Sequence, residues 1–160
     1  MWTDLSQKRL ADVTHFSAIY IGGGNTFKLL HDFKQTGFDH LLLQFLDQGG
    51  IVYGGSAGAI VLGKSIMTAS FLDPNEVALQ DTTGLDLLQG YSVWCHYQRE
   101  DDLKIRAYIE QYQHPVIALS EQTGLCVDAD GMHVVGFAPI IVFQRQRQVS
   151  FAPASPVKIL

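Results

Sequence analysis

One segment constrains the fold of this chain more than any other: residues 50–58, with the sequence GIVYGGSAG. A short apolar, β-branched run leads into Gly54-x-Ser56-x-Gly58, and small helix-compatible residues follow it. This pattern is typical of a nucleophile elbow, a strained strand-to-helix turn that lifts a serine hydroxyl above the edge of a sheet. Glycines flank the serine because a side chain there would meet the neighbouring backbone. The pattern makes Ser56 a candidate nucleophile, with a purely structural tight turn as the alternative.

The composition indicates one folded domain spanning residues 1–160. At 160 residues and 47% hydrophobic content the chain can bury a core, and no apolar run approaches membrane-spanning length. A formal charge of −5 without a basic block argues against nucleic acid and anionic membranes as partners. Cys95 and Cys126 are too few and too far apart for a metal motif or a disulfide framework. The N-terminus shows no signal peptide, so we expect a cytoplasmic protein with reduced thiols.

Strands and helices alternate through the first two-thirds of the chain. Helices are expected over residues 4–11, from 25 or 26 to near 37, from 38 to near 49, and over 101–113. Strands are expected over 17–21, directly before the elbow, and over 91–95, 116–119, 124–128, 132–136, 140–145 and 148–152. Residues 68–90 are expected to be loop with short helical pieces. The order predicts an α/β fold: a mostly parallel sheet covered on both faces, with a late antiparallel hairpin at Asp130-Gly131.

Several polar residues and glycines directly follow predicted strands. In sheets of this kind, ligands bind outside the carboxyl ends of the strands. That rule places four groups along one rim of the sheet: Gly22–Asn25, Ser56, His96 and Glu121. Their shared placement is the main physical argument for a functional site.

A serine hydroxyl needs a base to take its proton and a third group to orient that base. Of six histidines, only His96 directly follows a strand and opens a loop, although a hydrogen-bonded structural histidine is the alternative. Glu121 ends the next predicted strand and is the candidate orienting acid; Asp73 is its rival, and a solvated loop carboxylate is the other interpretation. Donors for a developing oxyanion are expected from the Ala57 amide and from Gly23 or Gly24, unless that triple glycine is a plain turn.

Four motifs in one order carry a family resemblance. Gly22-Gly23-Gly24-Asn25-Thr26-Phe27, the 54–59 elbow, Cys95-His96-Tyr97 and Ser120-Glu121-Gln122-Thr123-Gly124 resemble the peptidase E family, peptidase S51, over about residues 12–145. That family includes aspartyl dipeptidase and is related to cyanophycinase. The resemblance implies a three-layer α/β sandwich of the class I glutamine amidotransferase type. It also implies a Ser-His-Glu triad of Ser56, His96 and Glu121, with oxyanion and substrate contacts from Gly23, Gly24, Asn25 and Ala57.

The chain departs from the family pattern in three respects. It begins too late to hold the family's first strand–helix–strand unit, so we expect an exposed sheet edge that favours a homodimer. The arginine that would recognise an acidic side chain before the scissile bond has two candidates, Arg99 and Arg106, and a solvated helix face is the alternative for each. Asp73 does not align cleanly with a carboxylate sometimes assigned to the triad, so the third member stays open between Glu121 and Asp73.

Other functions fit the sequence less well. Residues 58–65 satisfy the P-loop pattern, but their Ala-Ile-Val-Leu run calls for burial, whereas a P-loop exposes its amides to phosphate. Residues 22–25 resemble a dinucleotide fingerprint, yet Phe27 replaces its third glycine. We therefore expect a serine peptidase that hydrolyses short peptides through an acyl-enzyme, with no metal or organic cofactor. The alternative is a truncated, catalytically silent member that acts as a binding or scaffold protein.

Overall fold

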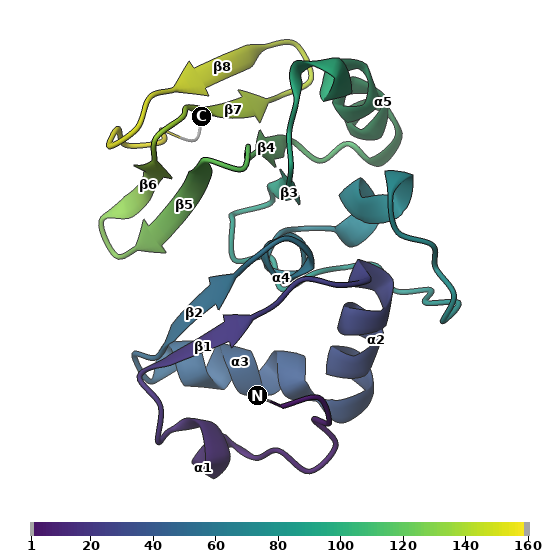
Figure 1. Cartoon of the computed structure of the whole chain (residues 1–160), viewed down its shortest axis with the longest axis vertical. Helices are drawn as coiled ribbons and strands as arrows, with labels where there is room; N and C mark the ends of the chain where they lie inside the picture. The colour runs from purple at the N-terminus through teal and green to yellow at the C-terminus, as the bar shows by residue number, and fades with distance from the viewer. Residues whose placement is uncertain (1, 159–160) are drawn as a thin grey trace.

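The first half of the molecule is built on two parallel strands (Figure 1). In the computed structural model, which describes residues 2–158, β1 (Ala18–Ile21) pairs in parallel with β2 (Ile51–Gly54). The connection between them forms α2 (Thr26–Thr36) and α3 (Phe38–Asp47). These helices bury the apolar side chains that recur at helical spacing in the sequence and pack them with β1 and β2 into the main core, which contains Phe27, Leu30, Phe33, Leu42 and Phe45.

The ends of α2 follow from its flanking residues. The Asn25 side chain accepts a hydrogen bond from the Lys28 amide at 2.9 Å and so caps the first turn. Gly37 ends the helix in the left-handed region, at φ 71°, and α3 starts directly after it. This tight junction folds α3 back beside α2 under the same two strands.

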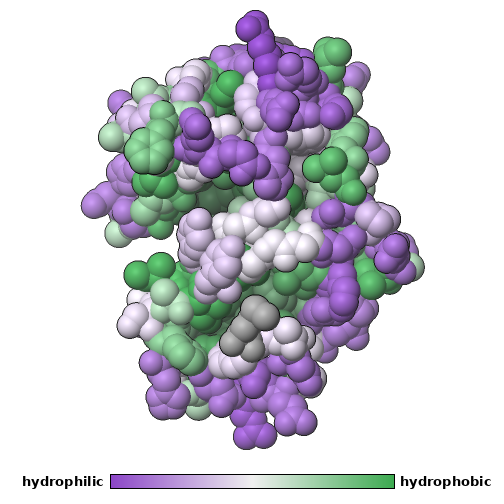
Figure 2. Space-filling view, viewed as in Figure 1, coloured by the Kyte–Doolittle hydropathy of each residue, from purple (hydrophilic) through white to green (hydrophobic). Residues whose placement is uncertain are grey.

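The opposite face of β1 and β2 is bare among the described residues. Tyr20 and Tyr53 lie side by side there with ring centroids 5.3 Å apart, and each is 65% exposed. Ile51 on the same face is 62% exposed. The surface view shows a notch between the half that contains β1–β2 and the half that contains β5–β6, with hydrophobic surface on both rims (Figure 2). The expectation of helices on both faces is therefore not met for this strand pair within residues 2–158.

The second half contains a mixed four-stranded sheet in the order β3-β4-β7-β8. Strands β3 (Ser92–Trp94) and β4 (Val116–Ala118) are parallel and are joined through η2 (Arg99–Asp101) and α5 (Asp102–Tyr112). Strands β7 (Ile140–Phe143) and β8 (Gln148–Phe151) add to it antiparallel. A separate hairpin of β5 (Thr123–Asp128) and β6 (Gly131–Gly136) confirms the late antiparallel hairpin.

Two expectations require correction. The strands do not form one mostly parallel sheet but are divided by hydrogen bonding into three sheets, because the sequence pattern identifies strands without fixing their partners. The helix expected over residues 4–11 is only α1 (Leu10–Val13): the Asp4 carboxylate binds the amide and hydroxyl of Ser6, and this local turn competes with a helix. The 68–90 stretch is loop after η1 (Ile66–Phe71), as expected.

Candidate active site

The turn at Ser56 has the strained backbone of a nucleophile elbow. Ser56 has φ 52° and ψ −118° between β2 and the short helix α4 (Ala57–Ile60). A Cβ on Gly54 would collide with the carbonyl of Gly58, and a Cβ on Gly58 would collide with the carbonyl of Ile21. Both glycines of the motif are therefore required by backbone contacts, and the strain they allow presents the serine hydroxyl at the end of β2.

Ser56 is one end of a hydrogen-bonded chain of three side chains. Its Oγ lies 2.8 Å from Nε2 of His96, and Nδ1 of the same imidazole is hydrogen-bonded to Oε1 of Glu121. A neutral imidazole that donates from Nδ1 to the carboxylate leaves Nε2 free to accept the serine proton. His96 follows β3 after Cys95 and has φ 57°, while Glu121 follows β4. The ends of three strands thus bring together a hydroxyl, a base and an acid that were predicted to share one rim.

Along these three hydrogen-bonded side chains, solvent exposure increases from the Ser56 hydroxyl to the Glu121 carboxylate. Ser56 is half-buried and is followed by two buried residues, Ala57 and Gly58. The side chain of His96 is 48% exposed, and that of Glu121 is 76% exposed. Water therefore screens the attraction between the carboxylate and a protonated imidazole more than it would at a buried site.

Backbone amides near Ser56 are available as hydrogen-bond donors within residues 2–158. Gly23 is adjacent to Ser56: a Cβ placed on Gly23 would lie 3.4 Å from the serine Cβ and 3.8 Å from its Oγ. None of residues 2–158 accepts a hydrogen bond from the amides of Gly23, Gly24 or Ala57. Free N–H groups beside a nucleophile are what a developing oxyanion requires.

A pocket of about 200 Å³ opens beside Ser56 and His96. It is formed by the start of α2, by η1 and the residues after it, and by the end of β3. Sequence reasoning did not identify Thr68, Leu72 or Trp94 as lining residues. No local signal marks them, because the three segments are distant in sequence and meet only in the folded chain.

Asp73 lies in this pocket but does not bind the histidine. Its Oδ2 accepts hydrogen bonds from the Thr26 amide at 2.8 Å and the Thr26 hydroxyl at 2.6 Å. The position next to Nδ1 is occupied by Glu121 instead. Asn25, besides capping α2, donates to the carbonyl of Pro74 at 2.8 Å, so the 73–74 segment is tied to the start of that helix.

The two candidate arginines lie elsewhere. Arg99 is exposed in η2, and Arg106 donates to Gln148 at 3.1 Å with its guanidinium 5.8 Å from the ring centre of Phe143. Neither lines the pocket beside Ser56 in the described part of the chain. A contact between either arginine and an acidic substrate side chain therefore stays a prediction.

Cys95 lies directly beneath the elbow without serving as a nucleophile. Its Sγ donates a weak hydrogen bond to the Ser56 carbonyl at 3.5 Å. Burial, with a contribution from the negative charge of Glu121, raises the pKa of the Cys95 thiol to about 12. The thiol therefore stays protonated at neutral pH and acts only as a packing group and weak donor.

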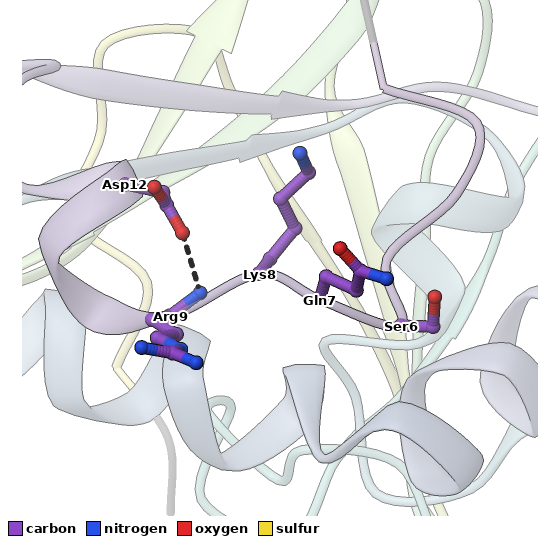
Figure 3. Close-up of a pocket in the computed structure, with 5 residues that line it drawn as sticks. All are labelled: Ser6, Gln7, Lys8, Arg9 and Asp12. Carbon is purple, nitrogen blue, oxygen red and sulfur yellow. Dashed lines mark hydrogen bonds between the residues drawn. The ribbon is translucent and has the colours of Figure 1, made fainter.

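A second hollow, of about 510 Å³, lies beside the N-terminal loop (Figure 3). Its lining residues are Ser6, Gln7, Lys8, Arg9 and Asp12. The Asp12 carboxylate is engaged with the Arg9 amide at 2.8 Å, and no histidine or cysteine is present to activate the Ser6 hydroxyl. Within residues 2–158, no three His, Cys, Asp or Glu side chains are grouped as metal ligands, and no helix is long and apolar enough to cross a membrane.

Comparisons with known proteins agree with the motifs. The chain is 38% identical over 100 residues to an uncharacterized peptidase of Pasteurella multocida, a match that covers 59% of this chain and 48% of the relative. It is 29% identical over 147 residues to peptidase E of Streptomyces coelicolor, covering 85% of this chain and 59% of the relative. The chain thus spans about half the length of the curated relatives it matches.

Solved structures share the fold. A crystal structure from Listeria monocytogenes assigned to peptidase E has a TM-score of 0.61 at 23% identity, covering 94% of this chain and 69% of that one. A peptidase from an acI-B1 actinobacterium has a TM-score of 0.69 at 20% identity, covering 94% and 62%. The model of peptidase family S51 matches residues 2–135. The mixed α/β chain described above therefore belongs to peptidase family S51.

Proposed function

We propose that this chain is a serine peptidase that hydrolyses short peptides through an acyl-enzyme intermediate. The observation that carries the proposal is the hydrogen-bonded chain from Ser56 Oγ through His96 to Glu121. Membership of peptidase family S51 supports the reaction class. Ser56 is the proposed nucleophile, His96 the general base and then acid, and Glu121 the group that orients the imidazole.

In the first half of the reaction, Ser56 Oγ attacks the peptide carbonyl carbon while its proton moves to Nε2 of His96. The amides of Ala57 and Gly23 are the proposed donors to the resulting oxyanion. His96 then returns the proton to the leaving amine nitrogen as the carbon–nitrogen bond breaks. A water molecule then attacks the ester carbon while His96 takes its proton. The bond from that carbon to Ser56 Oγ breaks, His96 returns the proton to Oγ, and the acid is released. Glu121 stabilises the imidazolium in both halves.

The proposed substrate class follows from the space available. The pocket beside Ser56 has a volume of about 200 Å³, which suits one small residue of the acyl part. The loop that follows η1 closes one side of the pocket with Leu72 and Asp73, which limits the length of chain that fits beside Ser56. These features favour short peptides as substrates.

The finer description of the fold belongs to the same proposal. We place the chain in a three-layer sandwich of the glutamine amidotransferase type, in which a further layer covers the bare face of β1 and β2. Support comes from Tyr20, Ile51 and Tyr53, which are exposed there although parallel strands are normally covered on both faces. The same bare face favours the second candidate function, a binding or scaffold protein that no longer turns over peptides.

Covalent labelling of Ser56 separates the two functions. We expect a neutral phosphonylating reagent to add one adduct to the wild-type chain, detected by intact mass. The adduct should be absent from Ser56→Ala and slowed at least about 1,000-fold in His96→Ala, because the base then no longer takes the serine proton. The rate of hydrolysis of dipeptide anilides should likewise be highest in wild type, lower in His96→Ala and absent in Ser56→Ala. A folded wild-type chain that takes up no adduct would favour the binding function.

A further inference from the structure

The pocket beside Ser56 is acidic. Asp73 lines it, and no lysine or arginine among the described residues does. The remaining walls are mostly apolar or small, including Leu72, Trp94 and Gly24. The Thr68 hydroxyl on the wall is already engaged, because it donates to the Val93 carbonyl at 2.7 Å. One carboxylate therefore determines the charge that the pocket accepts.

Asp73 is held in place with one oxygen unengaged. Both hydrogen bonds from Thr26 fall on Oδ2, which ties that oxygen to the start of α2. None of residues 2–158 donates a hydrogen bond to Oδ1. The group is half-buried in a pocket that it shares with the proposed nucleophile. A fixed acceptor in a partly dry site binds a cationic donor more strongly than a flexible surface carboxylate does.

We propose that Oδ1 of Asp73 binds an ammonium group in the acyl part of the substrate. The inference rests on the proposed function, since it names the substrate class of the same site. Two sources carry this chemistry: the free α-amino group of a peptide's first residue, and a lysine-type side chain at that position. An acidic side chain, by contrast, would enter the pocket next to Asp73 with no cation lining it, and like charges at short distance repel.

A purely structural role for Asp73 makes a different prediction. As a cap for α2, the carboxylate would stabilise the position of Thr26 and act on all substrates equally. Asp73→Asn distinguishes the two roles because the amide keeps an acceptor oxygen for Thr26 but loses the charge. The readout is the ratio of kcat/KM values for substrates with and without an ammonium group, which a structural role does not change.

Three anilides supply that ratio: alanine p-nitroanilide, N-acetyl-alanine p-nitroanilide and N-acetyl-lysine p-nitroanilide. We expect wild type to prefer an ammonium-bearing substrate over N-acetyl-alanine p-nitroanilide, and Asp73→Asn to reduce that preference by about 10- to 100-fold, the range for hydrogen bonds to charged groups. The ammonium-bearing substrate that is preferred shows whether the α-amino group or the lysine-type side chain binds Asp73. The matched control is Asp32→Asn, a half-buried carboxylate on α2 that pairs with Lys28 outside the pocket; the ratio should not change.

Several outcomes would overturn the inference. These are a wild-type ratio near one, a preference for N-acetyl-aspartate p-nitroanilide, and an equal loss on all substrates in Asp73→Asn. Failure of the proposed function is seen separately, as an absence of Ser56 labelling. Calorimetric binding of alaninamide against N-acetyl-alaninamide to Ser56→Ala tests the ammonium site without catalysis. Tighter binding of alaninamide that disappears in Ser56→Ala/Asp73→Asn supports it, and equal binding contradicts it.

Discussion

The two ends of the hydrogen-bonded chain are built in different ways. At the nucleophile end, Ser56 lies between glycines whose missing side chains are required by contacts with Gly58 and Ile21 carbonyls. At the acid end, Glu121 is 76% exposed and contacts the imidazole from a short turn after β4. The backbone therefore fixes the hydroxyl, whereas a solvent-exposed hydrogen bond orients the base. Substitutions at the first end should affect fold and activity together, and substitutions at the second end should affect rate alone.

The largest effect is expected from Gly58→Ala. A Cβ at this position collides with the carbonyl of Ile21, so either β1 must move or the elbow must open. Overpacking of this kind destabilises a fold by about 1–3 kcal/mol or more, and it displaces the nucleophile. We expect a lower free energy of unfolding in urea and no detectable labelling of Ser56.

Gly22→Ala is the matched control for that substitution. A Cβ on Gly22 would meet only a Tyr20 ring carbon at 3.9 Å, an ordinary contact. Its free energy of unfolding should stay within about 0.5 kcal/mol of wild type, as at sites away from a special constraint. An equal loss of unfolding free energy in the two variants would mean that any added methyl group destabilises this region, and the packing argument for the nucleophile end would be wrong.

A smaller effect is expected at the acid end. Triads with a buried acid lose about 10⁴-fold in kcat when the acid is neutralised. Because Glu121 is largely exposed, we expect Glu121→Ala to reduce the labelling rate of Ser56 by only about 10- to 100-fold, with no change in the free energy of unfolding. The rate of phosphonylation and urea unfolding measure the two quantities on the same sample.

The control for the acid end is Glu100→Ala, an exposed carboxylate in η2 that has no contact with His96 among the described interactions. It should leave the labelling rate within about 2-fold of wild type, because a single exposed charge acts weakly at a distance. A loss of 10⁴-fold in Glu121→Ala would show that the carboxylate is shielded from water in the reacting complex. The contrast between the two ends would then disappear.

The same contrast explains what the sequence could predict. The elbow at Ser56 is a local pattern whose glycines carry their own physical reason, and His96 and Glu121 follow from their positions after strands. The hydrogen bonds between Asp73 and Thr26 join residues 47 positions apart, and no local sequence pattern predicts them. From its place between the elbow and His96 in the sequence, Asp73 was a rival candidate for the triad acid, whereas its hydrogen-bond partner is Thr26 at the start of α2.

Strand pairing was also beyond local patterns. Apolar segments in the sequence predicted strands at β1 to β8, but three sheets form where one mostly parallel sheet was expected. The sequence pattern shows which side chains are apolar but not which strands are hydrogen-bonded to each other. A strand such as β2 therefore has the same sequence pattern whether it has one neighbouring strand or two.

The smallest effect is expected from the thiols, and it probes how dry the nucleophile end is. With its pKa raised to about 12 by burial and by the Glu121 charge, Cys95 is ionised to only about one part in 10⁴ at pH 8. Iodoacetamide at pH 8 should therefore modify exposed Cys126, leave Cys95 intact, and change Ser56 labelling less than about 2-fold. Alkylation of Cys95 should increase with pH up to about 12, since ionisation increases over that whole range. If the alkylation of Cys95, measured by peptide mass, instead levels off between pH 8 and 9, then water reaches the thiol and the nucleophile end is not dry.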